Sequence, residues 1–192
     1  MMYLILTVDI NGVLNAATLD LIHGWQGPQP IGNGVFPAGA RIASFKRGED
    51  VYIALLIDQN GALNVASLDP TKGWQGPDTV GNATLVPGSP ITVFQSNPTT
   101  YTALMIDQNG ALNVATLSAA NDWQGPDSLG NAALVPGSPV SVFKQSATTY
   151  AALMIDRNGV LNVASLDPSG SWSGPDTIGN AGFAPGTLVS AL

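Results

Sequence analysis

The sequence predicts an all-β protein assembled from four copies of one unit, and three observations carry that prediction. The four tryptophans recur every 49 residues, at Trp25, Trp74, Trp123 and Trp172. Residues 53–101 and 102–150 are identical at 32 of 49 aligned positions. The 192 residues include 22 glycines and 14 prolines but one Glu and six Lys plus Arg. Turns are therefore frequent, long-helix formers are scarce, and a helical bundle is excluded.

Each copy is predicted to form four short strands, as the third copy shows. Residues 102–107 (TALMID) are apolar, and Asn109-Gly110 predicts a tight type I′ turn before the partner strand 111–117 (ALNVATL). Residues 123–130 (WQGPDSLG) contain a proline, which cannot donate a ladder hydrogen bond and therefore places this strand at the sheet edge. A Pro/Gly-rich loop leads to 139–144 (PVSVFK). Repeated four-stranded units are typical of β-propeller blades. The alternative is a β-sandwich of repeated hairpins.

We expect a single β-propeller domain over residues 1–192, with four four-stranded blades. The chain begins at the TALMID-type strand (residues 2–9) and ends at 187–192 (TLVSAL), which aligns with the start of PVSVFK. Residues 187–192 are therefore predicted to supply the strand that the first blade lacks, so that the two termini share one blade and close the ring. A monomeric four-bladed ring is favoured. The alternative is a homodimer that forms an eight-bladed ring.

Charge and composition exclude several classes of protein. The net charge is −7, and half of the basic residues (Arg41, Lys46 and Arg47) fall in one stretch, so no basic stripe favours nucleic-acid binding. No cysteine is present, which excludes disulfides and thiolate chemistry. The apolar start, residues 1–8, is too short for a signal peptide or a membrane span. The sequence predicts a soluble protein without membrane insertion, and it leaves the compartment open.

The order of the motifs IDQNGALNVA and WQGPD resembles the blades of the fungal and bacterial fucose lectins. This resemblance implies a propeller with sugar sites between blades, each made by an Arg, a Glu and an aromatic residue. The Arg position falls here on Leu4, Ile53, Thr102 and Ala151, and the Glu position on Ala16, Val65, Val114 and Val163. Only the tryptophans match. The resemblance therefore implies the architecture without the fucose chemistry.

No catalytic constellation breaks the repeat, so the sequence predicts a protein that is not an enzyme and needs no cofactor. The lone histidine, His23, is interpreted as a solvated loop residue, and no serine lies in a G-x-S-x-G setting. The turn aspartates Asp58, Asp107 and Asp156 are expected to accept hydrogen bonds from their own hairpins. Calcium is the alternative ligand of these aspartates, but the further acidic residues of an EF-type loop are missing, so no metal site is predicted.

The Trp-Gln-Gly-Pro-Asp segment is the strongest candidate for a binding site. Tryptophan offers a flat apolar face on which sugar C–H groups stack, and Gln and Asp can hydrogen-bond hydroxyl groups. The candidate ligand-binding residues are Trp25, Trp74, Trp123, Trp172, Gln75, Gln124, Asp78, Asp127 and Asp176. The alternative interpretation is that each tryptophan only fills space between blades.

Asn64, Asn113 and Asn162 are further candidates, because each places an amide inside an otherwise apolar strand. A buried amide needs hydrogen-bond partners. The amide either satisfies the backbone of a neighbouring blade or lines a binding cleft, and the sequence leaves both possibilities open.

These patterns favour a non-catalytic, multivalent carbohydrate-binding protein with sites between blades and glycans as partners. The alternative is a structural scaffold that binds a protein surface through apolar loop residues, at Val35-Phe36, Leu85-Val86, Leu134-Val135 and Phe183. A sugar-processing enzyme is a third possibility. It would require one asymmetric polar cleft.

Overall fold

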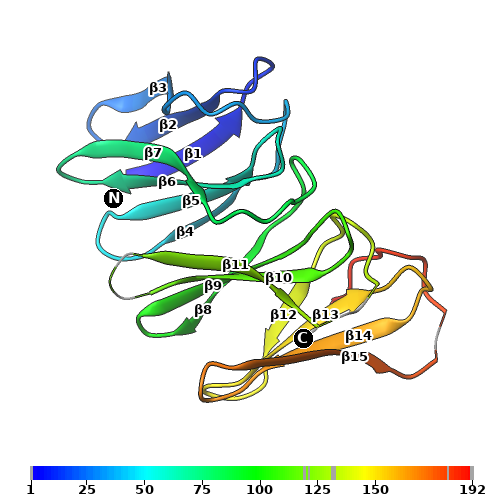
Figure 1. The fold of residues 1–192 in the computed structure, drawn as a ribbon. Helices are drawn as coiled ribbons and strands as arrows, with labels where there is room; N and C mark the ends of the chain where they lie inside the picture. The colour runs from blue at the N-terminus through cyan, green and yellow to red at the C-terminus, as the bar shows by residue number, and fades with distance from the viewer. Residues whose placement is uncertain (1, 119, 121, 131–132, 181, 191–192) are drawn as a thin grey trace.

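Four antiparallel sheets follow one another in chain order in the computed structural model (Figure 1), which describes residues 2–118, 120, 122–130, 133–180 and 182–190. The first blade is the three-stranded sheet β1 (Met2–Val8), β2 (Leu14–Asp20) and β3 (Gly24–Pro30). The second blade is β4 (Ala43–Lys46), β5 (Tyr52–Ile57), β6 (Leu63–Asp69) and β7 (Gly73–Val80). No helix occurs among these residues, so none of suitable length and hydropathy to cross a membrane is found there.

The third and fourth blades repeat the second. The third is β8 (Thr92–Asn97), β9 (Thr100–Ile106), β10 (Leu112–Leu117) and β11 (Trp123–Leu129). The fourth is β12 (Ser141–Lys144), β13 (Tyr150–Ile155), β14 (Leu161–Leu166) and β15 (Trp172–Ile178). The all-β prediction and the four-stranded unit are confirmed. The proline-containing strand lies at the edge of each sheet, as its missing N–H requires.

The core is divided into three clusters, each between two successive blades. Leu14 and Phe36 meet Leu56 between the first two blades. Leu55 and Leu85 meet Met105 between the second and third blades, and Leu104 and Leu134 meet Met154 between the third and fourth. The second and third blades therefore bury one apolar face against the blade before and the other against the blade after, while these clusters cover only one face of the first and of the fourth blade. This stacking is the physical reason for the repetition of apolar positions in the sequence.

The hairpin turn depends on glycine but is not the type I′ turn that the Asn-Gly pair predicts. Gly61 has φ of 80°, and its N–H donates to the carbonyl oxygen of Asp58 at 3.1 Å. Among the described residues Asp50 is the only non-glycine with positive φ, so Asn60 does not adopt the conformation that a type I′ turn demands. A glycine in the left-handed region after a turn is the arrangement of a G1 bulge, and the type I′ prediction is wrong.

The turn glycine also receives the loop that enters the next blade. The N–H of Leu85 donates to the carbonyl oxygen of Gly61 at 2.8 Å, and a Cβ on Gly61 would overlap the carbonyl oxygen of Leu85. Gly110 stands in the same relation to Leu134. Glycine is therefore required at this point both for its backbone angle and for its lack of a side chain.

The closing strand predicted from residues 187–192 is not confirmed. In the described part of the chain β1 pairs only with β2, and Val189 instead accepts a hydrogen bond from the Ser141 hydroxyl of β12. Val140 accepts the equivalent bond from Thr92, at the entry to β12. Residues 187–190 thus lie where a further inner strand would begin, and residues 191–192 lie outside the described residues. Ring closure stays a prediction.

Candidate functional site

The tryptophans stand at or next to the start of each outer strand and face the preceding blade. Trp74, Trp123 and Trp172 are half-buried and pack on the clusters that their blades share with the blades before them. Trp25 has no preceding blade in the described structure and is 57% exposed. The tryptophan therefore owes its burial to the neighbouring blade rather than to its own sheet.

Gln75 and Asp78 lie on the opposite face of their sheet from Trp74. Val65 pairs with Asp78, Ser67 with Gln75 and Leu68 with Trp74, and a bulge lies between the first two pairs. Side chains alternate between faces along a strand, and paired residues share a face. The glutamine and aspartate of the Trp-Gln-Gly-Pro-Asp segment consequently turn toward the next blade, while its tryptophan turns toward the previous one.

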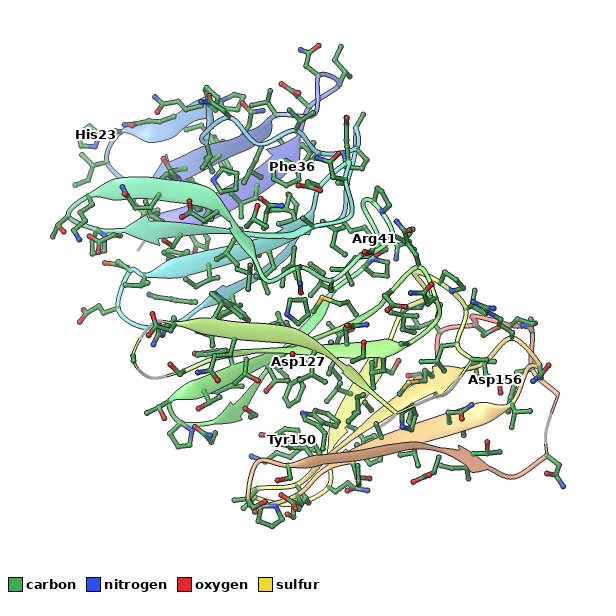
Figure 2. All side chains as sticks on the ribbon, viewed as in Figure 1. His23, Phe36, Arg41, Asp127, Tyr150 and Asp156 are labelled. Atoms are coloured by element: carbon green, nitrogen blue, oxygen red, sulfur yellow. The ribbon has the colours of Figure 1, made fainter. Side chains whose placement is uncertain are left out.

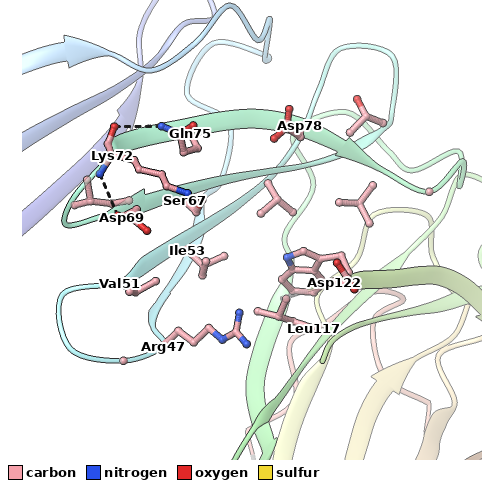
Figure 3. Close-up of a pocket in the computed structure, with 17 residues that line it drawn as sticks. Arg47, Val51, Ile53, Ser67, Asp69, Lys72, Gln75, Asp78, Leu117 and Asp122 are labelled. Atoms are coloured by element: carbon pink, nitrogen blue, oxygen red, sulfur yellow. Dashed lines mark hydrogen bonds between the residues drawn. The ribbon is translucent and has the colours of Figure 1, made fainter. Parts of the chain in front are cut away.

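One cleft joins the Gln and Asp of the second blade to the tryptophan of the third. We call it the charged cleft; its volume is about 760 Å³, within the range of small-molecule sites. Figure 3 shows Arg47, Asp69, Lys72, Gln75, Asp78 and Asp122 around it. Its apolar lining includes Val51, Ile53, Val65, Leu117 and Trp123. An aromatic face, hydrogen-bond acceptors and cationic donors therefore converge on one space.

The charged cleft has a fixed polar rim. The Asp69 carboxylate accepts hydrogen bonds from the Thr71 hydroxyl at 2.6 Å and from the N–H groups of Thr71 and Lys72 at 2.8 and 3.0 Å. The bond from the Thr71 hydroxyl is the largest cause that lowers the pKa of Asp69 below its usual 3.8. Gln75 donates to the carbonyl oxygens of Lys72 and Trp74. Asp69 is thus tied into its own turn, and Asp78 is an exposed carboxylate inside the cleft.

The next cleft, between the third and fourth blades, is smaller and lined by hydroxyl groups. We call it the hydroxyl cleft; its volume is about 150 Å³. Its lining includes Ser96, Thr100, Thr102, Thr116, Thr148, Asp167, Ser169 and Trp172. Gln124 and Asp127, the repeat equivalents of Gln75 and Asp78, are exposed but do not belong to this lining. Asp176 is exposed on the outer strand of the fourth blade.

The asparagine candidates lie inside their own blades. Asn64 is buried, and its amide N–H donates to the Asp58 carboxylate at 3.1 Å and to the Ala62 carbonyl at 3.0 Å. Its amide oxygen accepts from the Thr79 hydroxyl of β7 at 3.4 Å. Asn113 and Asn162 are also buried: they donate to the carbonyl oxygens of Ala111 and Val160, just before β10 and β14, and accept from the hydroxyls of Ser128 and Thr177 on the outer strands. These hydrogen bonds all lie within the blade that carries the amide, and the three asparagines do not line the charged cleft or the hydroxyl cleft, so their part in ligand binding stays a prediction.

The turn aspartates have the structural role that the sequence indicates. Asp58 accepts from the N–H groups of Asn60 and Ala62 at 2.8 and 2.9 Å, and Asp107 and Asp156 repeat this pattern. Figure 2 shows Asp156 at the turn end of the fourth blade and His23 at the far side of the first. Among the described residues no group of three or more His, Cys, Asp or Glu residues could hold a metal ion.

Sequence reasoning missed the charged lining residues Arg47, Asp69, Lys72 and Asp122, and Arg47 is the one that reaches across to the next blade. Its guanidinium donates to the carbonyl oxygen of Ser118 in the third blade at 2.9 Å. The equivalent positions in the following copies hold Ser96 and Gln145. The sequence could have pointed to Arg47, because an arginine is rare in a chain with six basic residues and stands here where the repeat otherwise has uncharged residues.

Comparison with known proteins gives a structural match without a sequence-family match. No family model and no curated protein matches the sequence. The BP39L lectin from Burkholderia pseudomallei aligns over 96% of this chain with 30% identity and a TM-score of 0.85. A fucose-specific lectin from Aleuria aurantia, also described as a six-bladed β-propeller, aligns over 97% with 15% identity and a TM-score of 0.60.

The chain resembles the fucose-lectin β-propellers. It spans about half of the Burkholderia lectin (54%) and 65% of the Aleuria lectin, so it corresponds to part of each propeller. Ile53 and Val65, at the positions to which the resemblance assigns Arg and Glu, line the charged cleft, and Thr102 lines the hydroxyl cleft. The chain shares the fold of these lectins, and the cleft-lining positions Ile53, Val65 and Thr102 carry neither Arg nor Glu.

Proposed function

We propose that this chain is a non-catalytic carbohydrate-binding protein whose sites lie in the clefts between successive blades. The observation that carries this proposal is the charged cleft, where Trp123 of one blade meets Gln75 and Asp78 of the blade before it. The 30% identity to a lectin over nearly the whole chain supports the same function.

The cleft offers the complementary groups that a saccharide needs. A sugar ring has an apolar face of C–H groups, which suits the half-buried indole of Trp123. Its hydroxyl groups can donate hydrogen bonds to the Asp78 carboxylate and to the Gln75 amide oxygen, because the Gln75 amide nitrogen already donates to the carbonyl oxygens of Lys72 and Trp74. Each site draws on two blades, so a chain of stacked blades offers several clefts, and rigidly linked sites raise avidity.

The structure narrows the surface available to the protein-binding alternative. Phe36, Leu85 and Leu134 are fully buried between blades, so they cannot form an exposed apolar contact surface. Val35 and Phe183 remain exposed, and Val86 and Val135 are partly exposed. Three of the seven apolar loop residues therefore join one blade to the next, and the other four would carry any protein contact.

A paired substitution tests the proposed site. A glycan array with the labelled chain identifies a bound saccharide, and calorimetry then measures its affinity for Asp78→Asn and Asp127→Asn. Both aspartates are exposed and the replacement preserves volume, but only Asp78 lines a described cleft. We expect Asp78→Asn to weaken binding about tenfold, as loss of a charged hydrogen bond would, and Asp127→Asn to leave it unchanged. Equal affinities in both variants would contradict the assignment, and an array without any bound glycan would contradict the function.

A further inference from the structure

Arg47 makes the charged cleft different from the cleft that follows it. It is half-buried in the turn between β4 and β5, where the third blade has Ser96 and the fourth blade has Gln145. Because the copies are otherwise so similar, a single large cation at this position is a local change rather than part of the repeated architecture.

The Arg47 side chain ties two blades together across the cleft. Its bond to the Ser118 carbonyl reaches the turn between β10 and β11, 71 residues further along the chain. The Ser118 N–H in turn donates to the Asp122 carbonyl at 3.1 Å, which closes the turn immediately before Trp123. Figure 3 shows the arginine extending from the second blade toward Leu117 and Asp122 of the third. The position of Trp123 opposite Asp78 is therefore linked to Arg47.

The hydroxyl cleft has a different arrangement at the same place. The Ser96 hydroxyl donates to the Thr100 carbonyl at 3.3 Å and accepts from the Thr102 hydroxyl at 3.0 Å, both within the third blade. A short serine side chain cannot span to the next blade as the arginine does. The volume of this cleft is about 150 Å³ against about 760 Å³ for the charged cleft.

We propose that Arg47 is a positioning residue that holds the charged cleft at the width of a saccharide, so that the two clefts are unequal sites. This inference rests on the proposed function. The charged cleft binds the ligand between Asp78 and Trp123, while the hydroxyl cleft binds it much more weakly. The repeat therefore provides a similar cleft between each pair of blades, and Arg47, which breaks the repeat, makes one of these clefts the stronger binding site.

The first test measures the cleft without any ligand. The chain has no cysteine, so nitroxide labels can be placed cleanly at Lys72→Cys and Ala120→Cys, two exposed positions on its two sides. Pulsed EPR distances are compared with and without Arg47→Ser, which installs the residue of the hydroxyl cleft. We expect the distance distribution to broaden or shift. An unchanged distribution would overturn the positioning role.

The matched control is Arg157→Gln. Arg157 also joins two blades, through bonds of 3.0 Å to the carbonyl oxygens of Leu134 and Asn109, but it does not line either cleft. Glutamine is the natural residue at the equivalent position of the third copy, Gln108. This variant should leave the label distances unchanged. A change equal to that of Arg47→Ser would show general loosening of the blades instead of a cleft-specific effect.

The second test measures binding. Calorimetry uses methyl glycosides of fucose, galactose, mannose and glucuronic acid. Arg47→Ser should raise the Kd of the bound glycoside at least tenfold, Arg47→Lys should restore part of the affinity, and Ser96→Ala and Arg157→Gln should change it less than twofold. Equal losses in Arg47→Ser and Ser96→Ala would overturn the inequality of the clefts. Absence of binding to every glycoside by the unmodified chain would count against the proposed function, while the EPR result would still decide the role of Arg47.

Discussion

The charged cleft and the hydroxyl cleft are built on the same backbone and differ in a few side chains. Both lie between successive blades, and both place a tryptophan of the later blade against a sheet of the earlier one. The charged cleft has Arg47, Gln75 and Asp78, while the hydroxyl cleft has a row of Ser and Thr hydroxyls. The comparison shows that the repeat determines where a site can form, and that departures from the repeat determine what the site contains.

The shared backbone should show the largest effects, and these should be equal in the two clefts. Valine at Gly61 or Gly110 would place a β-branched side chain at φ of 80° or 85° and into the carbonyl oxygen of Leu85 or Leu134. We expect each substitution to lower the free energy of unfolding by about 3 kcal/mol or more. Chemical denaturation measures this change.

Gly39→Ala is the control for the backbone effect. Gly39 has φ of 69°, but no atom lies within 4 Å of the place where its Cβ would be. The expected cost is about 1 kcal/mol, from the left-handed backbone alone. If Gly110→Val were no more costly than Gly39→Ala, the close approach between turn and loop would not contribute to stability.

Replacing a tryptophan that is packed between two blades should cost more stability than replacing one that is exposed. Trp123→Ala removes a half-buried ring from the cluster between the second and third blades, and we expect a loss of about 2–4 kcal/mol together with loss of saccharide binding in the charged cleft. Trp25→Ala removes a ring that is 57% exposed, and the loss should stay below about 1 kcal/mol with binding intact. Equal destabilisation by both variants would contradict the dependence of tryptophan burial on the preceding blade.

Replacing a buried asparagine should lower the free energy of unfolding and leave the affinity for the ligand unchanged. Asn113→Ala removes the bonds to the Ala111 carbonyl and from the Ser128 hydroxyl, although the Ala111 carbonyl keeps its bond from the Asp107 N–H, and the expected cost is about 1–3 kcal/mol. Calorimetry with the glycoside should give an unchanged Kd, because Asn113 is not among the residues that line either cleft. A lower affinity at unchanged stability would show that Asn113 belongs to the binding site.

The smallest expected effect is the pH response of the two turn aspartates beside the clefts. Hydrogen bonds, first from the Thr71 or Ser169 hydroxyl, lower the pKa of Asp69 and of Asp167 below 3.8. A lowered folded-state pKa means that these bonds stabilise the fold above about pH 4 and that this contribution is lost as the pH falls through the folded-state pKa. Thr71→Val should raise the pKa of Asp69 toward 3.8 and leave Asp167 unchanged in a carboxyl NMR titration. A pKa of Asp69 that did not move would show that the hydroxyl is not its main partner.

Most of the fold could be predicted from the sequence because the same pattern of strands and turns occurs in four copies. The 49-residue period, the edge proline and the hydrogen-bonding role of Asp58 depend on local chemistry that is visible in the residues. The turn type was wrong because Asn60-Gly61 fits both a two-residue type I′ turn and a longer turn that ends in a G1 bulge, and the bonds from the N–H groups of Asn60 and Ala62 to the Asp58 carboxylate close the longer one.

The composition of the site was only partly predictable. Trp74 and Gln75 are neighbours in a strand and must face opposite sides, so strand alternation alone could have assigned them to different clefts. That Asp78 stays on the side of Gln75 depends on the bulge in the pairing of β6 with β7, which the sequence did not reveal. The place of Arg47 beside Trp123 depends on how two blades stack, and a single blade does not contain that information.

The central claim is that a saccharide binds between Asp78 and Trp123, across two blades. The four indole N–H groups give one NMR signal each in a chain with four tryptophans, so a titration with the bound glycoside reports on each blade separately. We predict that the Trp123 signal shifts with saturation while those of Trp25 and Trp172 stay within error. A titration in which Trp25 shifts as far as Trp123, or in which Trp123 does not respond to a glycoside that binds, would contradict the account.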